Sequence, residues 1–367
     1  MKLKNIFFSI TMISIFVLIL SACVGNQTSN TDDNSNDPNS PNKNEVIELD
    51  LNTWLPSTHH NISLAYEPWA KIVDEKTNGR VKINILTGGA LGGSGTHLED
   101  LQGGLYDITH GTIGYYPDTD LFKLTVFDLP FAFENTRDAS DAITKYFELH
   151  GTGDWPDKVT VSKKGVTTDP YVLFSTKEIR TVEDLKGMKI RVASDVWNEV
   201  LKSLGATPVF MPNDELYAAL DRGVVDAATY SPIGAQGLKL YEPAPYILNF
   251  PLQTIGLDPM IRTGALEEMS EDLRELFVEE LLPELSELLI QDVEKLLPEI
   301  WNEYEQLIEG RGEIITWSEE EKNKFKRAAE TAWDMWVETA NQKGYDGDQI
   351  MEEFKQIRKD LGLQPVF

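Results

Sequence analysis

Three short segments of the chain alternate between apolar and polar residues, namely 47–54, 81–88 and 106–112. A period of two places the apolar side chains on one face, which is typical of a strand with one buried face. Between the first two segments, residues 63–79 carry apolar residues at helical spacing and end in Asn-Gly, a signal for the end of a helix. Strands that alternate with a helix predict an α/β fold with a largely parallel sheet.

The same pattern returns further along the chain and predicts a second α/β unit. Its expected helices lie at 195–205 and 213–223, and its expected strands are 171–176, 188–194, 206–211 and 224–231. Further strands near 160–170 and 245–263 would connect the two units. Ligands of open α/β sheets bind outside the carboxyl ends of the strands. In the first unit, the loops at that edge would be 55–60, 88–96 and 111–117.

From about residue 270 the sequence is predominantly helical. Leu, Ile and Val recur there at the spacing of a packed amphipathic helix. Pro283 and Pro298 are expected to kink this helix or break it into pieces, and they disrupt the heptads that a coiled coil would need. A further helix is expected after Ser318, which stands three residues before Glu321 as in a capping box.

The first residues of the chain have the layout of an export signal. Lys2 and Lys4 precede an apolar run at 6–20, which is short for a membrane span. Leu-Ser-Ala stands directly before Cys23, the only cysteine, and this resembles the cleavage site of bacterial lipoproteins, whose cysteine is lipidated. We expect residues 1–22 to be a lipoprotein signal peptide and Cys23 to carry lipid. The alternative is a plain signal peptide with an incidental cysteine.

Residues 24–45 are mostly Asn, Asp, Ser, Thr and Pro. Such a segment buries too little apolar surface to offset its chain entropy, so we expect 23–46 to be the lipidated cysteine followed by a disordered tether. The folded part would then be held at the extracytoplasmic face of the membrane. A domain in that place meets neither ATP nor NAD, which argues against many classes of enzyme.

The chain of 367 residues has a formal net charge of −27. Binding of nucleic acid needs a basic surface, so we expect no nucleic-acid partner. If the ligand is an anion, a local positive site has to attract it, because the negative net charge of the whole molecule repels it.

No motif for catalysis or for a cofactor is present. The sequence lacks G-x-S-x-G, H-E-x-x-H, a Walker loop and a Cys–His pair, so we expect neither an enzyme nor a cofactor. The side chains of the neighbours His59 and His60 are expected to point in different directions, and no spacing rule joins them to His97 or His110. We therefore expect no histidine metal site. A Na⁺ or Ca²⁺ ion held by carboxylates beside the ligand stays open.

Five segments, in order, resemble one family of proteins. The part of the chain from 50 to 345 resembles the DctP-type solute-binding proteins of tripartite ATP-independent periplasmic (TRAP) transporters. The segments are 67–85, 90–108, 126–135, 181–192 and 204–227. The last two carry the strongest resemblance, in TVEDLKGMKIRV and LGATPVFMPNDELYAALDRGVVDA.

Arg191 lies in the strand of the first of these two segments. From the pattern alone, Arg191 is either a solvated charge at the end of a strand or a planar guanidinium group that binds an anion. The resemblance implies the second, since the family's arginine in this segment forms a bidentate pair with the carboxylate of the ligand. It also implies pocket contacts at Asn213 and Ser194, and Glu215 lies in the same matched segment.

Other candidate residues follow from departures from the family pattern. After Val-Val-Asp at 224–226, Ala-Ala-Thr-Tyr stands in place of the Gly-Gln-Glu-Asn of sialic-acid binders, and the polar candidates that remain are Thr229, Tyr230 and Ser231. Tyr171 stands where those proteins carry a second arginine. This difference argues against sialic acid and favours a monocarboxylate, or a less charged acid, over a dicarboxylate.

Aromatic residues are expected at the cleft from the first unit. The candidates are Trp54 and His59 near the first strand, and Tyr115 and Tyr116 in the Gly-Tyr-Tyr-Pro turn. Their flat faces suit an apolar or planar ligand body. Packing in the core is the alternative role for each.

These observations predict an α/β fold of the periplasmic-binding-protein type, with two lobes, a ligand cleft between them and a long C-terminal helical segment. Lobe I would comprise 47–168 and 256–300, and lobe II would comprise 169–255 and 301–367. Two such lobes can close over a ligand by a hinge motion.

The expected function is that of an extracytoplasmic solute-binding lipoprotein of a TRAP transporter, anchored to the bacterial membrane. It would bind a small organic carboxylate and deliver it to the permease subunits in the membrane, and we expect a monomer. An ABC-type or sensor-linked solute-binding lipoprotein for a small organic acid is the alternative. An enzyme on the same scaffold is a third possibility.

Overall fold

The computed structural model of the protein describes residues 46–367. The predicted signal peptide, the predicted lipidation of Cys23 and all but the last residue of the predicted tether therefore lie outside the described residues. Within 46–367, no helix is both long and apolar enough to cross a membrane.

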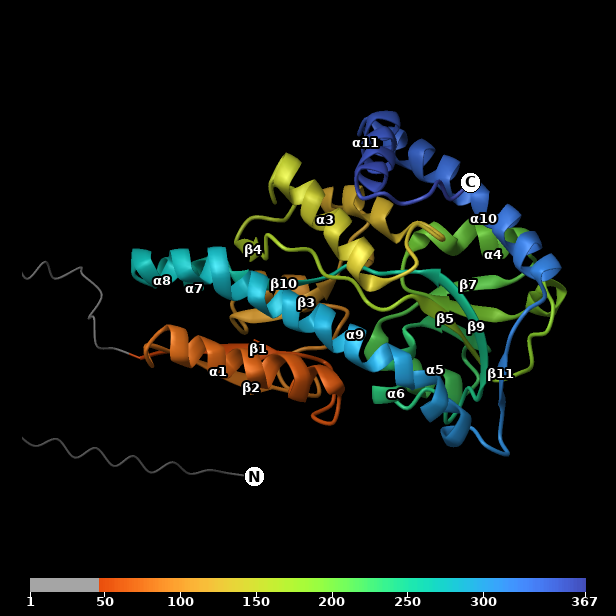
Figure 1. The fold of residues 1–367 in the computed structure, drawn as a ribbon, viewed down its shortest axis with the longest axis horizontal. Helices are drawn as coiled ribbons and strands as arrows, with labels where there is room; N and C mark the ends of the chain where they lie inside the picture. Colours follow the sequence, from red (N-terminus) through yellow and green to blue (C-terminus); the bar gives the residue numbers. More distant parts are fainter. Residues whose placement is uncertain (1–45) are drawn as a thin grey trace, which may run out of the picture. The chain divides into compact units, whose positions relative to one another are not determined.

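The first sheet has five strands in the order β2-β1-β3-β10-β4 (Figure 1). Strand β1 pairs in parallel with β2 and β3, whereas β10 runs antiparallel to β3 and β4. The sheet is mixed because β10, which comes from the second half of the chain, runs antiparallel to both of its neighbours. The strands are β1 (Ile47–Asn52), β2 (Val81–Leu86), β3 (Ile108–Thr112), β4 (Val159–Val161) and β10 (Leu257–Arg262).

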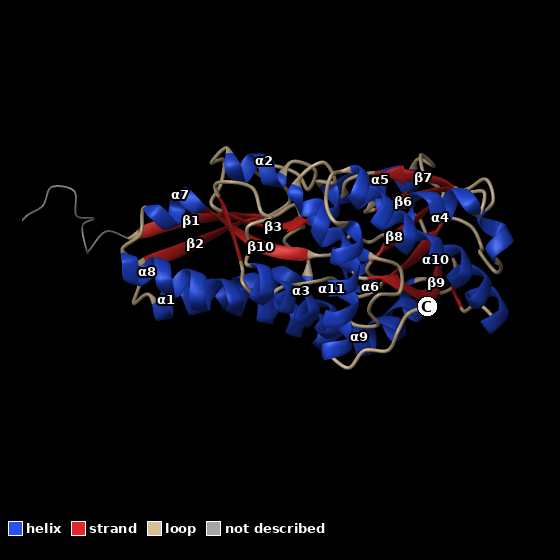
Figure 2. Ribbon diagram, turned by 90° about the horizontal axis from the view of Figure 1, so that it is seen from above, coloured by secondary structure: helices blue, strands red, loops and turns tan. Residues whose placement is uncertain are grey.

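Helices cover both faces of this sheet, which is why its central strands are buried on both sides (Figure 2). One apolar core joins β1 and β2 to a first group of helices, and another joins a second group of helices to the C-terminal helices. The first group is η1 (Ile62–Tyr66), α1 (Glu67–Lys76), α7 (Thr263–Glu267), α8 (Glu271–Leu276) and η7 (Phe277–Leu281). The second group is α2 (His97–Gln102), η2 (Ile113–Tyr115), η3 (Asp120–Asp128) and α3 (Thr136–His150).

The second sheet has six strands in the order β11-β9-β5-β8-β6-β7. Strand β6 pairs in parallel with β7 and β8, and β5 runs antiparallel to β8 and β9. The strands are β5 (Tyr171–Ser175), β6 (Lys189–Val192), β7 (Thr207–Phe210), β8 (Ala227–Tyr230), β9 (Tyr246–Gln253) and β11 (Glu313–Ile315). Its helices are η4 (Val182–Leu185), η5 (Asp195–Trp197), α4 (Asn198–Ser203), η6 (Asn213–Glu215), α5 (Leu216–Asp221) and α6 (Pro232–Gly237).

Helix α9 (Leu282–Leu307) packs against both sheets, as Figure 1 shows. Its first half contributes Leu285 to the core of the first sheet, and its second half contributes Tyr304 to the core of the second. The helix continues through Pro298, and Pro283 lies in its first turn directly after the π-helical η7. The expectation that these prolines could break the helix is therefore wrong. Pro283 follows a π-helical turn within one continuous helical run, and such a turn accommodates a residue that cannot donate the usual backbone hydrogen bond.

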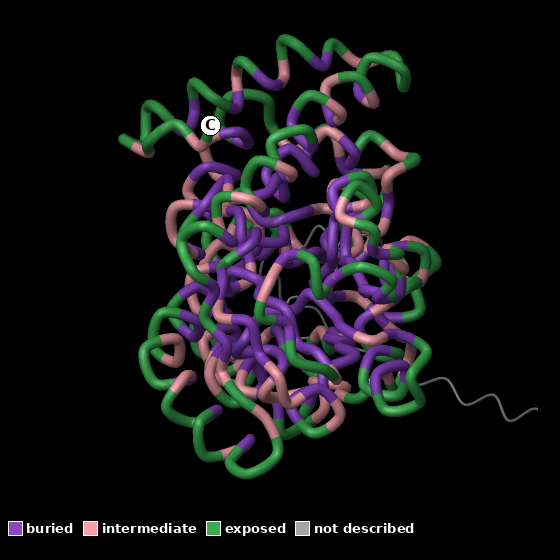
Figure 3. The backbone as a smooth tube through the Cα atoms, turned by 90° about the vertical axis from the view of Figure 1, so that its right-hand side faces the viewer, coloured by how far each residue is buried: buried purple, intermediate pink, exposed green. Residues whose placement is uncertain are grey.

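Two further helices end the chain, α10 (Glu319–Gln342) and α11 (Gly347–Asp360). The first part of α10 packs on the second sheet through Phe325, and its later part packs on the side of the first sheet through Trp336. Helix α11 packs against α3 and η3, on the side of the first sheet. Figure 3 shows the buried chain segments inside and the exposed turns of these helices outside.

The predicted α/β fold with two sheets and long C-terminal helices is confirmed. The lobe boundaries stay a prediction, because the described residues 46–367 lie within one compact unit.

Candidate ligand-binding site

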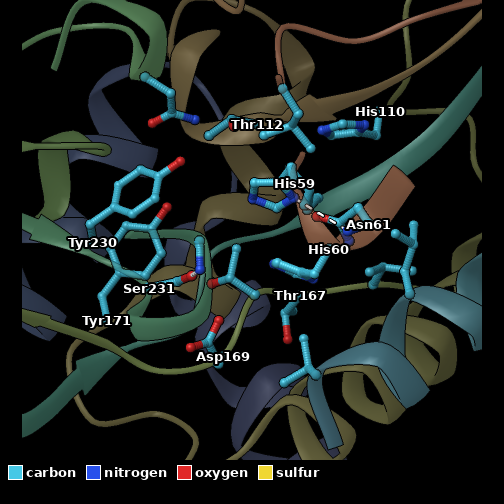
Figure 4. Close-up of a pocket in the computed structure, with 18 of the residues that line it drawn as sticks. His59, His60, Asn61, His110, Thr112, Thr167, Asp169, Tyr171, Tyr230 and Ser231 are labelled. Atoms are coloured by element: carbon cyan, nitrogen blue, oxygen red, sulfur yellow. Dashed lines mark hydrogen bonds between the residues drawn. The ribbon is translucent and has the colours of Figure 1, made fainter. Parts of the chain in front are cut away.

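A cavity of about 50 Å³ lies between the carboxyl ends of strands from the two sheets (Figure 4). Its walls come from the loop after β1, from β3, from the crossover before β5, from the start of β5, from the end of β8 and from α9. The lining residues are Trp54, Leu55, His59, His60, Asn61, His110, Thr112, Val166, Thr167, Thr168, Asp169, Tyr171, Asn213, Tyr230, Ser231, Gly234, Leu257, Leu289 and Val293.

Two tyrosines form the wall on the side of the second sheet. Tyr171 begins β5 and Tyr230 ends β8, and their ring centroids lie 5.4 Å apart because the two strands are antiparallel neighbours. Burial raises the pKa of both hydroxyls above the ordinary value, so both remain neutral donors and acceptors. In Figure 4 both rings face the histidines across the pocket.

His59 and His60 lie opposite the tyrosines. Their ring centroids are 4.1 Å apart, so the expectation that these side chains point in different directions is wrong. A helix begins at His60, and His59 stands directly before it, so both rings lie at the N-terminal end of this helix. His60 Nδ1 lies 2.6 Å from the Asp292 carboxylate on α9, which also accepts a hydrogen bond of 3.1 Å from Asn61 Nδ2.

His110 and Trp54 form the wall on the side of the first sheet. Their ring centroids lie 4.3 Å apart, and His110 Nδ1 is hydrogen-bonded to the hydroxyl of Tyr66. Burial lowers the pKa of His110 to about 3. Burial also lowers the pKa of His59 well below its ordinary value, with a smaller contribution from His60 and His110. Both His59 and His110 are therefore neutral at physiological pH.

Asp169 is the acidic group of the cavity wall. One of its carboxylate oxygens accepts a hydrogen bond of 3.0 Å from the backbone N–H of Ile233, at the start of α6. Burial raises the pKa of Asp169 to about 6. Next to it, Ser231 caps α6 and accepts a hydrogen bond of 2.9 Å from the N–H of Gly234.

Arg191 lies directly behind this wall and is 0% exposed. Its Nη2 donates to Asn213 Oδ1 at 2.7 Å and to the Tyr115 hydroxyl at 3.0 Å. Its Nε and Nη1 donate to the backbone carbonyls of Met211 at 3.0 Å and Thr229 at 3.2 Å. All four acceptors are neutral, and no acidic side chain within 46–367 forms an ion pair with Arg191. Arg191 is not itself among the residues that line the cavity.

The two sheets are joined tightly around the cavity by short contacts. Ser94, in the Gly-rich loop after β2, accepts a hydrogen bond of 3.0 Å from the N–H of Asn213 and donates one of 2.5 Å to Asp214. A Cβ on Gly93 would lie 2.5 Å from the Asp214 carboxylate, and a Cβ on Gly114 would lie 3.0 Å from the carbonyl of Ala193. Glycine at these places allows the loops of one sheet to meet the other closely.

The predicted site residues fall into two groups. The cavity brings together Trp54, His59, Tyr171, Asn213, Tyr230 and Ser231, and Arg191 and Tyr115 contact this group from behind. The other four do not line the cavity, namely Ser194, Thr229, Glu215 and Tyr116.

Each of those four residues has a different place. Ser194 caps η5 and borders a neighbouring hollow, while Glu215 is exposed. Thr229 contributes its backbone carbonyl to Arg191. The Tyr116 hydroxyl binds the N–H of Leu98 at 3.1 Å, within the elements of the first sheet.

Several residues of the cavity were not predicted to contact ligand, namely His60, Asn61, His110, Thr112, Thr167, Thr168 and Asp169. A usable signal existed for two of them. His110 and Thr112 stand at the end of a predicted strand, at the sheet edge where ligands bind. Within the described residues, no group of three or more His, Cys, Asp or Glu side chains is placed to hold a metal ion.

The sequence from 52 to 339 matches the family of bacterial extracellular solute-binding proteins, family 7, known as DctP. The match covers more than half of the chain. The chain belongs to this family. The prediction of a DctP-type solute-binding protein in place of an enzyme is thereby confirmed, as is an extracytoplasmic location.

Relatives of known structure or name agree with this membership. A TRAP periplasmic solute-binding protein of Bordetella bronchiseptica, solved with bound (R)- and (S)-mandelate, is 25% identical with a TM-score of 0.74 and covers 86% of this chain and 99% of its own. A monocarboxylate 2-oxoacid-binding periplasmic protein of Nostoc is 26% identical over 310 residues, which are 80% of each chain. An uncharacterized protein of Sinorhizobium fredii is 31% identical over 196 residues, and this chain spans only 34% of its length.

Proposed function

We propose that this DctP-family protein captures a small monocarboxylate in the cavity between its two sheets and delivers it to the membrane subunits of a TRAP transporter. The carboxylate would bind at Arg191, and the remaining carbon skeleton would lie between Tyr171, Tyr230 and the histidines. The lobe division at 168/169 and 255/256 is part of this proposal, since closure of one lobe on the other would enclose the ligand.

The observation that carries the proposal is the buried, uncompensated charge of Arg191. Removing a cation from water costs roughly several kcal/mol unless an anion compensates its charge. The four acceptors of the Arg191 guanidinium are all neutral. A carboxylate that replaced Asn213 Oδ1 and the Tyr115 hydroxyl would supply the missing charge. Such charge-assisted bonds are about twice as strong as neutral ones.

The size of the cavity favours a small ligand. A water molecule needs roughly 10–15 Å³ of such space, so about 50 Å³ corresponds to only a few heavy atoms. The names of two relatives point to a single carboxylate, because monocarboxylate 2-oxoacids and mandelate each carry one. The presence of Tyr171 in place of a second cation further favours a single carboxylate.

The lipid anchor is the second part of the proposal and rests on the sequence alone. Cleavage before Cys23 and lipidation of its thiol would leave the folded domain tethered by residues 24–45. A Cys23→Ser variant expressed in the native bacterium should appear in the soluble extracytoplasmic fraction, while the wild type stays with the membrane. Equal membrane retention of both proteins would contradict the anchor.

An ABC-type or sensor-linked role was the alternative, and the family match favours TRAP over both. Deletion of this gene and, in a second strain, of the genes for the TRAP membrane subunits separates them. Equal loss of uptake of the ligand in both strains supports TRAP transport. Unchanged uptake in the strain without the TRAP membrane subunits would assign the protein to another system.

A thermal-shift screen tests the proposed ligand class. Purified protein is heated with 2-oxo acids, hydroxy acids, simple fatty acids, dicarboxylates and aromatic acids. A ligand at about a thousand times its Kd should add roughly 4 kcal/mol to the free energy of unfolding, which shifts Tm by several degrees. The shift should be lost in Arg191→Lys, because lysine keeps the charge but cannot form the planar bidentate pair. An unchanged shift in that variant contradicts the assignment of Arg191.

A further inference from the structure

Four aromatic ring nitrogens without a hydrogen-bond partner within 46–367 belong to residues that line this one cavity. They are Trp54 Nε1, His59 Nε2, His60 Nε2 and His110 Nε2. Trp54, His59 and His110 are 7%, 3% and 2% exposed, so water outside the cavity does not reach them. An unpaired buried polar group is costly, and four around one space indicate that the space receives a polar partner.

Two of these nitrogens are fixed as donors. The indole nitrogen of Trp54 carries a hydrogen in every state. His59 Nδ1 accepts a hydrogen bond of 3.3 Å from the backbone N–H of Asn61, so the proton of the neutral imidazole resides on Nε2. Both groups therefore require an acceptor, which is an oxygen atom in an organic acid.

His60 complements these donors. Its Nδ1 faces the Asp292 carboxylate at 2.6 Å, and a carboxylate only accepts, so Nδ1 carries the hydrogen. Its Nε2 accepts the hydrogen of a hydroxyl group when only Nδ1 carries a hydrogen, and it donates to a carbonyl oxygen when both nitrogens do. The ligand oxygen in this part of the cavity can thus be a carbonyl or a hydroxyl.

The charges around these nitrogens exclude a second carboxylate. No lysine or arginine is among the cavity-lining residues of the described chain. Asp169 lines the cavity, and Asp292 stands directly behind His60 and Asn61. A second negative group here would face the acidic side chains of Asp169 and Asp292 and the neutral rings of His59 and His110, in a region of low dielectric.

We propose that Trp54 and His59, with His60 and His110 beside them, form a neutral polar subsite that binds a carbonyl or hydroxyl oxygen on the ligand's carbon skeleton. The ligand class is therefore a small monocarboxylate with one additional neutral oxygen, such as an oxo acid or a hydroxy acid. The inference rests on the proposed function, which supplies the carboxylate at Arg191.

Matched pairs of acids test the subsite in the unaltered protein. Isothermal titration compares 2-oxobutyrate and 3-hydroxybutyrate with butyrate, which has the same chain length but no additional oxygen, and with succinate, which has a second carboxylate. At least one oxygenated acid should bind about tenfold or more tightly than butyrate and succinate. Equal affinity for butyrate, or tighter binding of succinate, overturns the inference.

A pair of tryptophan variants locates the effect. Trp54→Phe keeps a flat aromatic side chain but removes the N–H, so it should lower the affinity for the oxygenated acid about tenfold and leave the affinity for butyrate unchanged. Trp155→Phe is the matched control. Trp155 Nε1 is also buried and unpaired within 46–367, but it belongs to the core of the first sheet and not to this cavity. Equal losses for both acids, or an equal effect of the control, overturn the inference.

The two proposals fail in different ways. If acids bind, and binding is lost in Arg191→Lys, but oxygenated and plain acids bind equally, only the subsite is wrong. If no acid binds, or if Arg191→Lys binds them all as the wild type does, the proposed function fails and the subsite fails with it.

Discussion

The guanidinium of Arg191, on β6 of the second sheet, donates a hydrogen bond of 3.0 Å to the hydroxyl of Tyr115, which follows β3 of the first sheet. The same Nη2 donates to Asn213 at 2.7 Å. The arginine expected to bind the ligand's carboxylate therefore also joins the two sheets. Ligand binding and closure are thus predicted to depend on the same side chain.

Tyr115→Phe should strengthen ligand binding without unfolding the protein. The variant loses a hydrogen bond to Arg191 that the free protein makes and that the carboxylate is proposed to replace. Such a bond contributes about 0.5–1.5 kcal/mol, so the Kd of the ligand should fall roughly two- to tenfold. Titration calorimetry measures this change. Tyr116→Phe is the control, because the Tyr116 hydroxyl binds Leu98 and Glu99 within the first sheet's elements. The same change of affinity in both variants would contradict a specific role for Tyr115.

Gly237→Ala should weaken ligand binding by displacing His59. A Cβ on Gly237 would lie 2.4 Å from His59 Cδ2, closer than real Cβ contacts. Overpacking of this kind costs about 1–3 kcal/mol, so we expect about a tenfold rise in the Kd of the ligand. The gain in helix propensity from alanine at the end of α6 is about 1 kcal/mol at most, so Tm of the ligand-free protein should also fall, by a few degrees.

The control for this variant is Gly153→Ala, where an added Cβ meets nothing within 4 Å. It should leave the Kd unchanged. An unchanged Kd in Gly237→Ala as well would show that His59 does not contribute to the site.

The strands of the site were predictable from local pattern, whereas the composition of the cavity was not. Alternation located β6 and β8, and with them Arg191 and Tyr230. The cavity, however, joins Trp54 to Tyr230 and His60 to Asp292, pairs that lie far apart in the chain. The periodicity of the sequence does not predict these contacts, because they depend on how the two sheets and α9 pack against one another.

Single side chains were mispredicted for local reasons. The side chains of His59 and His60 are predicted to point in different directions, but their rings lie together where a helix begins at His60. Glu215 and Tyr116 lie beside residues of the site in sequence, yet one faces solvent and the other packs in the first sheet's core. Proximity in sequence does not settle the direction of a side chain at the end of a short element.

Asp128→Asn should stabilise the protein at alkaline pH. Burial raises the pKa of Asp128 from 3.8 in the unfolded chain to about 8, helped by the nearby Asp258. The neutral carboxyl's contribution to stability is therefore complete below pH 3.8 and is lost as pH rises to about 8. Asparagine cannot ionise and can still accept the 3.1 Å bond from Gly256. Tm of the variant relative to wild type should rise by several degrees between pH 5 and pH 9.

Asp226→Asn is the control for this pH dependence. The hydrogen-bonded ion pair with Lys177 lowers the pKa of Asp226, so its contribution is present above its unfolded pKa and is lost only as pH falls through the lower folded value. Its effect on Tm should be constant between pH 5 and pH 9. A constant difference for Asp128→Asn as well would show that Asp128 is ionised in the folded protein.

A crystal structure with the tightest-binding acid of the screen tests the central claim most directly. We predict a carboxylate oxygen about 2.7–2.9 Å from Arg191, with the bond to Asn213 or to Tyr115 exchanged for it. The carbon skeleton should lie between the tyrosines and the histidines. A carboxylate bound elsewhere, with Arg191 still donating to both Asn213 and Tyr115, would contradict the account.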